Sequence, residues 1–152
     1  MDMVFNIIIF CLLFCLSGVY VFYSNRVFID STESIIKASE FLFYKRDSSV
    51  EHAFLLVLNE HNRLVRCYHT CLNERNRVGF GIEGVISYSK RNNVSGVILI
   101  HNHPSLDIEP SKLDLNSTKK AAKELNYQGI KLKDHVILGG KEHYSFAENG
   151  LL

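Results

Sequence analysis

The amino-acid sequence predicts an α/β fold, a mixed β-sheet flanked by helices and preceded by one N-terminal hydrophobic helix. Two uninterrupted apolar runs of strand length, Ala53–Leu58 and Val97–Ile100, are typical of strands buried on both faces of a sheet. Helical patterns alternate with these runs, and the clearest of them covers about Lys112–Asn126. The order helix, strands, helix, strand, helix, strands therefore favours one sheet packed between helices.

Length and composition limit the class of protein. The 152 residues suit one domain, and 47% apolar with 22% charged residues is globular composition, which argues against disorder and against a multi-span membrane protein. The net charge of +1 gives no strong field towards nucleic acid, so we expect no nucleic-acid partner.

The N-terminal segment differs from the rest of the chain. Val4–Tyr23 carries no charged residue and is long enough to span a bilayer as one helix. We expect residues 1–26 to be a transmembrane anchor and residues 27–152 to be the folded domain. A cleaved signal peptide, a buried core helix and a mis-assigned start are the alternatives. Basic residues follow the apolar run, which predicts a single-pass membrane protein whose C-terminal domain is cytoplasmic.

The elements of the domain follow in order. Asp30-Ser31-Thr32-Glu33 is a helix-start signal, and a second strand after Ala53–Leu58 is expected from Arg63 to about Leu72. A modest helix begins near Ile82. After Val97–Ile100, Pro104 stops the strand and Pro110-Ser111 opens the clearest helix. Two final strands, Asp134–Leu138 and about His143–Phe146, flank a Gly139-Gly140 turn.

Cysteine and histidine residues on the second strand are interpreted as structural. Cys67, His69 and Cys71 alternate along this strand and therefore share one face. Zinc would need a fourth ligand and a better spacing than this one, so half-buried thiols are favoured. His52, His61 and His69 lack partner spacing and are expected to be surface or satisfied histidines.

His101-Asn102-His103-Pro104 has a different pattern. Both imidazoles follow a buried strand directly and point to one side of the sheet, at the strand end where open α/β sheets build their sites. Asp114 stands in the first turn of the next helix, which a short loop folds back towards them. Two imidazoles and one carboxylate form a catalytic type of zinc set, because three protein ligands leave a fourth position for water.

These residues resemble the JAMM metalloprotease motif, in the form found in its bacterial RadC branch. His101-Asn102-His103-Pro104-Ser105, Pro110-Ser111-x-x-Asp114, Asp134-His135 and Tyr144-Ser145-Phe146-Ala147-Glu148 are all similar to RadC signatures, from about residue 30 to the last residue. The resemblance implies a JAB/MPN-like (cytidine-deaminase-like) fold with one Zn²⁺ per chain.

The same resemblance implies a role for each site residue. His101, His103 and Asp114 correspond to the metal ligands, and Ser111 to the hydroxyl that holds the oxyanion. Glu51 occupies the place of the catalytic glutamate, the general base, with Glu83 as its rival. The implied activity is hydrolysis of a peptide or isopeptide bond in a peptide or protein substrate by a zinc-activated water.

The chain departs from the RadC pattern at three points. Leu106 replaces the usual glycine after His-Asn-His-Pro-Ser, where a side chain would stiffen or crowd the loop over the metal. Gly81-Ile82-Glu83 stands near the place of the usual Pro-Arg-Glu. We expect the hydrophobic segment to stand in place of the helix-hairpin-helix region that commonly precedes the RadC domain, which weakens a DNA-related role. A catalytically silent MPN-type binding module and a DNA-repair-associated protein without protease activity are the alternative functions.

Overall fold

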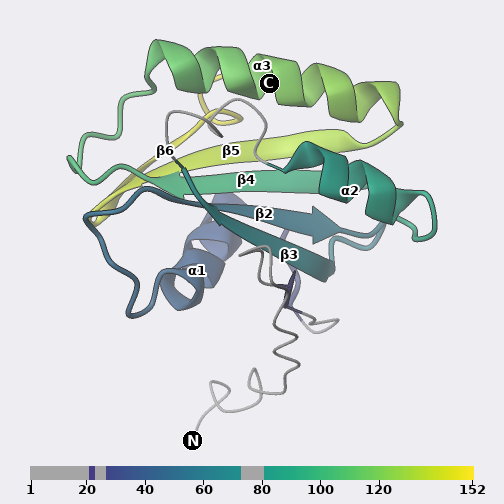
Figure 1. The fold of residues 1–152 in the computed structure, drawn as a ribbon, viewed down its shortest axis with the longest axis horizontal. Helices are drawn as coiled ribbons and strands as arrows, with labels where there is room; N and C mark the ends of the chain where they lie inside the picture. The colour runs from purple at the N-terminus through teal and green to yellow at the C-terminus, as the bar shows by residue number, and fades with distance from the viewer. Residues whose placement is uncertain (1–20, 23–26, 73–80) are drawn as a thin grey trace, which may run out of the picture.

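A six-stranded sheet forms the centre of the molecule (Figure 1). The computed structural model describes residues 21–22, 27–72 and 81–152. In the order in which they pair, the strands are β1 (Val21–Phe22), β3 (Leu64–Cys71), β2 (His52–Leu58), β4 (Gly96–Asn102), β5 (Lys131–Gly139) and β6 (Glu142–Ser145). Only the β4–β5 pair is parallel among the described strands, so the sheet is mixed, as predicted.

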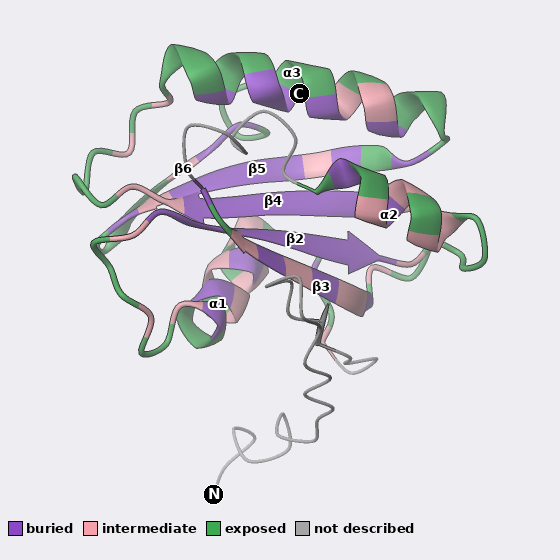
Figure 2. Ribbon diagram, viewed as in Figure 1, coloured by how far each residue is buried: buried purple, intermediate pink, exposed green. Residues whose placement is uncertain are grey.

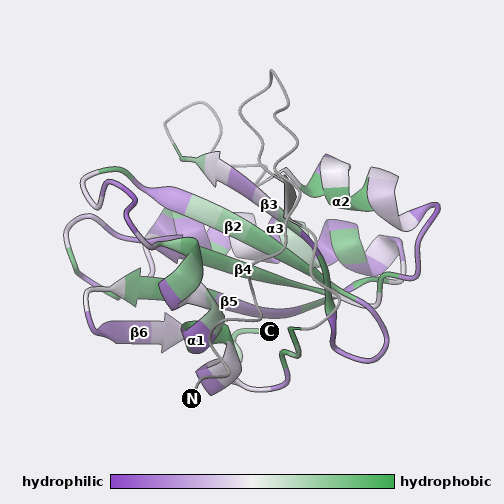
Figure 3. Cartoon of the chain, turned by 90° about the horizontal axis from the view of Figure 1, so that it is seen from below, coloured by the Kyte–Doolittle hydropathy of each residue, from purple (hydrophilic) through white to green (hydrophobic). Residues whose placement is uncertain are grey.

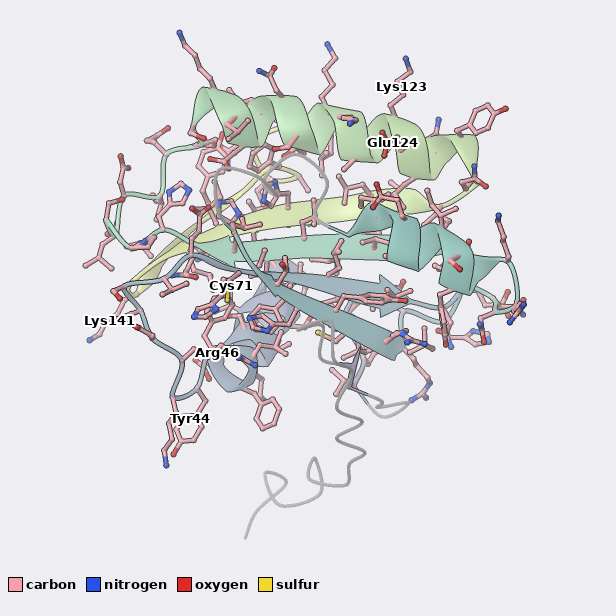
Figure 4. The ribbon with its side chains drawn as sticks, in the orientation of Figure 1. Tyr44, Arg46, Cys71, Lys123, Glu124 and Lys141 are labelled. Carbon is pink, nitrogen blue, oxygen red and sulfur yellow. The ribbon has the colours of Figure 1, made fainter. Side chains whose placement is uncertain are left out.

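Helices cover both faces of this sheet. Figure 1 shows α1 (Thr32–Leu42) on one face, with α2 (Ile82–Ser89) and α3 (Lys112–Tyr127) on the other. The outer side of α3 carries charged residues such as Lys123, which points away from the sheet (Figure 4). α3 is the crossover between the parallel strands β4 and β5. The predicted architecture of a mixed sheet flanked by helices is therefore confirmed.

Strand β2 is buried along its whole length, which explains its unbroken apolar sequence (Figure 2). Its side chains alternate between two cores: Leu55 packs on the α2 and α3 side, whereas Phe54 packs on the α1 side. Figure 3 shows β2 and β4 as the hydrophobic centre of the fold. The same alternation sends the side chains of Glu51 and His52, at the start of β2, to opposite faces.

Capping fixes where the helices begin. Ser31 precedes α1 and Ser111 precedes α3, and each forms a capping box with the residue three positions later. In α3 that residue is Asp114, so the cap also fixes the position of a predicted site carboxylate.

The side chain of Asn102 ties the end of β4 to the start of β2. Its Oδ1 accepts a hydrogen bond from the backbone N–H of His52 at 2.8 Å, and its Nδ2 donates to the carbonyl of Val50 at 3.1 Å. Glu51 lies between these two anchored residues. Its backbone is thereby held beside the end of β4.

The predicted hydrophobic helix through Tyr23 is wrong at its C-terminal end. Val21 and Phe22 form strand β1 and pair with Tyr68 and Cys67 of β3, which a continuous spanning helix does not allow. Across residues 21–22, 27–72 and 81–152, no helix combines the length and the apolar character needed to cross a bilayer. The prediction of a single-pass membrane protein with a cytoplasmic domain is corrected accordingly. Residues 1–20 and 23–26 of the proposed anchor lie outside the described residues.

Candidate metal centre

Four predicted site residues converge on the face of the sheet that α3 covers. Glu51 precedes β2, His101 ends the buried part of β4, His103 follows it, and Asp114 lies in the first turn of α3. One side-chain nitrogen or oxygen from each lies within 4.8 Å of the others. Such a group of two imidazoles and two carboxylates can hold a metal ion.

His101 Nε2 is the central atom of this group. It lies 3.0 Å from Nε2 of His103, 3.4 Å from Oδ1 of Asp114 and 3.7 Å from Oε1 of Glu51. His103 Nε2 lies 3.5 Å from Oδ2 of Asp114. The side chain of His101 is fully buried and that of His103 is 14% exposed, so solvent reaches the centre from the His103 side.

A chain of hydrogen bonds sets the protonation of His101. Thr118 Oγ1 donates to the Asp114 carbonyl at 2.6 Å, because a carbonyl only accepts. The Thr118 oxygen therefore accepts from Nδ1 of His135 at 2.6 Å, which leaves Nε2 of His135 to accept from Nδ1 of His101 at 2.8 Å. The unprotonated nitrogen of His101 is then Nε2, the atom that faces His103 and Asp114.

His135 is neutral in this chain. It is fully buried and stacks on Phe146 with ring centroids 4.6 Å apart. Burial lowers its pKa well below the ordinary value, and the nearby His101 lowers it further. His135 and Thr118 contact the group through hydrogen bonds and were not assigned to the site from the sequence, although Asp134-His135 was noted as a signature.

The ring of His103 is oriented in a similar way. Its Nδ1 donates to the carbonyl of Asp107 at 2.6 Å, which again leaves Nε2 directed at the centre. The hydrogen bond with Asp114 raises the pKa of His103, although partial burial opposes this shift. In the metal-free protein, His103 therefore holds a proton more tightly than an ordinary histidine.

Asp114 is held as an anion. Burial would raise its pKa, but hydrogen bonds from His103 and Ser111 outweigh burial and hold the pKa well below its usual range. Ser111 donates from both its backbone N–H, at 2.8 Å, and its hydroxyl to Oδ2 of this carboxylate. The hydroxyl of Ser111 thus contacts Asp114 in this structure and belongs to the helix cap.

The two candidate glutamates lie in different environments. Glu51 is 7% exposed and is part of the group. Glu83 is exposed in the first turn of α2 and is not among the described residues that form the group. Of the two, the geometry brings only Glu51 to the histidines.

Leu106 does not crowd the centre. Its side chain is 61% exposed, and its backbone has φ of 65°, in the left-handed region that favours glycine. Glycine is what the RadC pattern has at this position. The cost of the replacement is therefore backbone strain in the loop and not obstruction of the centre.

The fold and this arrangement agree with the comparison to protein families. A model described as the RadC-like JAB domain matches residues 29–151. The chain belongs to the RadC-like JAB domain family. The resemblance inferred from the His-x-His and Ser-x-x-Asp motifs is thereby confirmed.

Curated relatives of this RadC-like chain carry UPF0758 names. The chain is 37% identical over 98 residues to the UPF0758 protein YeeS of Escherichia coli, covering 64% of this chain and 66% of YeeS. It is 35% identical over 102 residues to YfjY of the same organism, covering 67% and 64%. A UPF0758 protein of Chlorobium phaeovibrioides is 36% identical over 106 residues, covering 70% and 48%. The chain thus spans about half to two thirds of the length of these relatives.

Proposed function

We propose that this RadC-like domain is a zinc-dependent metallopeptidase of the JAMM type. The observation that carries the proposal is the convergence of Glu51, His101, His103 and Asp114 on one buried point. His101, His103 and Asp114 would hold one Zn²⁺, and Glu51 would act as the general base.

The donor set fits zinc. Imidazole nitrogens and a carboxylate oxygen are ordinary zinc ligands, and each histidine here directs Nε2 at the centre while Nδ1 bonds elsewhere. Asp114 is already ionised, as a ligand must be. When bound, zinc supplies a Lewis acid and lowers the pKa of water from about 15.7 to about 7.

Glu51 is suited to move a proton. Its carboxylate is buried at the same point but comes from another strand, and Oε1 lies 3.7 Å from His101 Nε2. A general base must come within hydrogen-bond reach of the proton that it takes, and Oε1 is next to the ligand atoms. Glu51 would accept the proton of the attacking water on Oε1 and pass it to the leaving amine.

Ser111 orients the Asp114 carboxylate in this proposal. Its hydroxyl donates to Oδ2 of Asp114, and its side chain is exposed at the start of α3. The role of oxyanion donor requires this hydroxyl to rotate from Asp114 to the substrate. A peptide or protein is the proposed substrate, with a peptide or isopeptide bond cleaved.

A catalytically silent binding module is not favoured. Such a module has no need of the complete set of three ligands and a buried carboxylate, all of which are present. A DNA-repair-associated role without hydrolysis is not favoured either, because a net charge of +1 gives no strong field towards nucleic acid.

The test is cleavage profiling of a proteome-derived peptide library by the full chain. Wild-type protein loaded with zinc is compared with Glu51→Gln, and Glu83→Gln is the matched control. We expect cleavage by wild type and Glu83→Gln, and a loss on the order of 100-fold or more in Glu51→Gln, as for a general base. Equal cleavage by Glu51→Gln, or none by zinc-loaded wild type, would overturn the proposal.

A further inference from the structure

A second group of metal-ligating side chains lies on the opposite face of the sheet, the face covered by α1. Its members are His52, at the start of β2, and His69 and Cys71, at the end of β3. His52 pairs directly with Cys71 in the antiparallel register, and His69 is two residues earlier on β3. All three side chains therefore share one face.

The distances suit one small ion. His52 Nδ1 lies 3.1 Å from His69 Nε2 and 3.4 Å from Cys71 Sγ, and all three atoms lie within 4.8 Å of one another. Zinc–nitrogen bonds of about 2.0–2.1 Å and zinc–sulfur bonds of about 2.3 Å put tetrahedral ligands about 3.4 Å (N···N) and about 3.6 Å (N···S) apart. The separations of His52 Nδ1 from His69 Nε2 and from Cys71 Sγ are within about 0.3 Å of these values.

Neighbouring groups fix both rings. His52 Nε2 donates to the carbonyl of Asp47 at 3.1 Å, so its lone pair is on Nδ1, the atom that faces His69 and Cys71. His69 stacks on Phe54 with centroids 4.6 Å apart and planes at 24°. The two imidazoles are therefore held in place before any ion arrives.

Charge and access are compatible with a cation. Burial lowers the pKa of His52 and brings that of His69 to about 4, so both rings are neutral at neutral pH, as ligands must be. The Arg46 charge lowers the pKa of both rings, and the Asp47 charge opposes it at His52. Cys71 is exposed, and Figure 4 shows its sulfur on the side of the sheet that α1 covers.

We propose that His52, His69 and Cys71 form a second metal site, which binds a thiophilic transition-metal ion of the Zn²⁺ type. Both donor types favour zinc among the common divalent ions, since imidazole and thiolate are its usual ligands. The ion would join the start of β2 to the end of β3, one residue from Glu51. Its role is to brace that strand end, and it is independent of the proposed peptidase chemistry.

The two centres differ in their ligand atoms, and this difference allows an experiment to distinguish them. The proposed catalytic centre has no sulfur ligand, whereas the second site has Cys71. Only the second site gives a thiolate-to-cobalt charge-transfer band in the near ultraviolet. The test is a titration of the full chain with Co²⁺ after chelation, under anaerobic reducing conditions.

We expect the band in wild type and its loss in Cys71→Ser. Asp114→Asn should keep the band, because it alters only the other centre. Cys67→Ala is the thiol control and should also keep it, because Cys67 is buried in the core and burial raises its pKa to about 12. His69→Gln, which keeps every thiol, should weaken cobalt binding at this site by at least about tenfold. Circular dichroism checks folding.

Two results would overturn the second site. One is the absence of a charge-transfer band in wild type at saturating Co²⁺, and the other is a band of full intensity in Cys71→Ser. Neither result bears on the proposed peptidase centre. If instead the proposed peptidase centre binds no metal, Asp114→Asn should bind as much metal as wild type and should keep the same charge-transfer band.

Discussion

Replacing Thr118 by valine should weaken zinc binding, although its side chain offers no atom to the metal. The hydroxyl is the acceptor for Nδ1–H of His135, and His135 in turn accepts from His101. Valine keeps the shape of threonine but removes this acceptor. A buried N–H is then left without a partner, or both imidazoles change tautomer.

Both outcomes have a definite cost. An unsatisfied donor on the fully buried His135 costs about 1–3 kcal/mol of folding free energy. If the imidazoles change tautomer instead, Nε2 of His101 carries a proton and must lose it before it binds zinc. Loss of such an outer contact typically lowers metal affinity by about 10–100-fold, or about 1.4–2.7 kcal/mol.

The assay is a competitive titration of zinc against a chromophoric chelator, together with urea unfolding of the chelated protein. Ser117→Ala is the matched control, because Ser117 is a buried neighbour on α3 whose hydroxyl donates to the backbone carbonyls of Leu113 and Asp114 and not to a histidine. Equal zinc affinity in Thr118→Val and Ser117→Ala would refute the claim that this chain of hydrogen bonds determines which nitrogen of His101 is protonated.

Three further predictions follow from single contacts. Leu106→Gly should raise the free energy of unfolding by about 0.5–1 kcal/mol, because relief of the left-handed backbone strain (about 1–2 kcal/mol) exceeds the entropic cost of glycine. Urea unfolding measures this change, and a lower free energy of unfolding in the variant would contradict the prediction. Asn102→Ala should lower the free energy of unfolding by about 2 kcal/mol in the same assay, since two hydrogen bonds are lost. A change below about 0.5 kcal/mol would show that the Asn102 side chain does not hold β4 to β2. Zinc affinity should rise with pH through and above about 6.5, because the pKa of His103 is raised and a proton on this ring competes with the ion. Chelator titrations at several pH values measure this affinity, and an affinity that does not change with pH would argue against His103 as a ligand.

The sequence predicted most of the central sheet because burial leaves a local signature. Ala53–Leu58 and Val97–Ile100 lie within β2 and β4, and the capped helix after Ser111 is α3. The His-x-His motif was also predictable, since alternation along β4 puts both rings on one face. These features depend on residues that are close in the chain.

Features that depend on register could not be predicted in this way. His52 and His69 were expected to be surface or satisfied histidines, and their positions beside Cys71 come from the β2–β3 pairing, which residue spacing along the chain does not show. Thr118 meets His135 only because α3 crosses back over β5. The pairing of Val21–Phe22 with β3 was missed for the same reason, since apolar composition alone suggested a continuous helix.

Zinc content by elemental analysis is the most direct test of the central claim, that His101, His103 and Asp114 hold a catalytic zinc served by Glu51. The full chain is purified without chelator in the Cys71→Ser background, which removes the second site from the count. One zinc per chain is expected, none after adding His103→Gln, and one again after adding Glu51→Gln. Metal-free protein, or zinc that survives His103→Gln in full, would contradict the assigned ligands, and loss of zinc in Glu51→Gln would make Glu51 a ligand instead of the base.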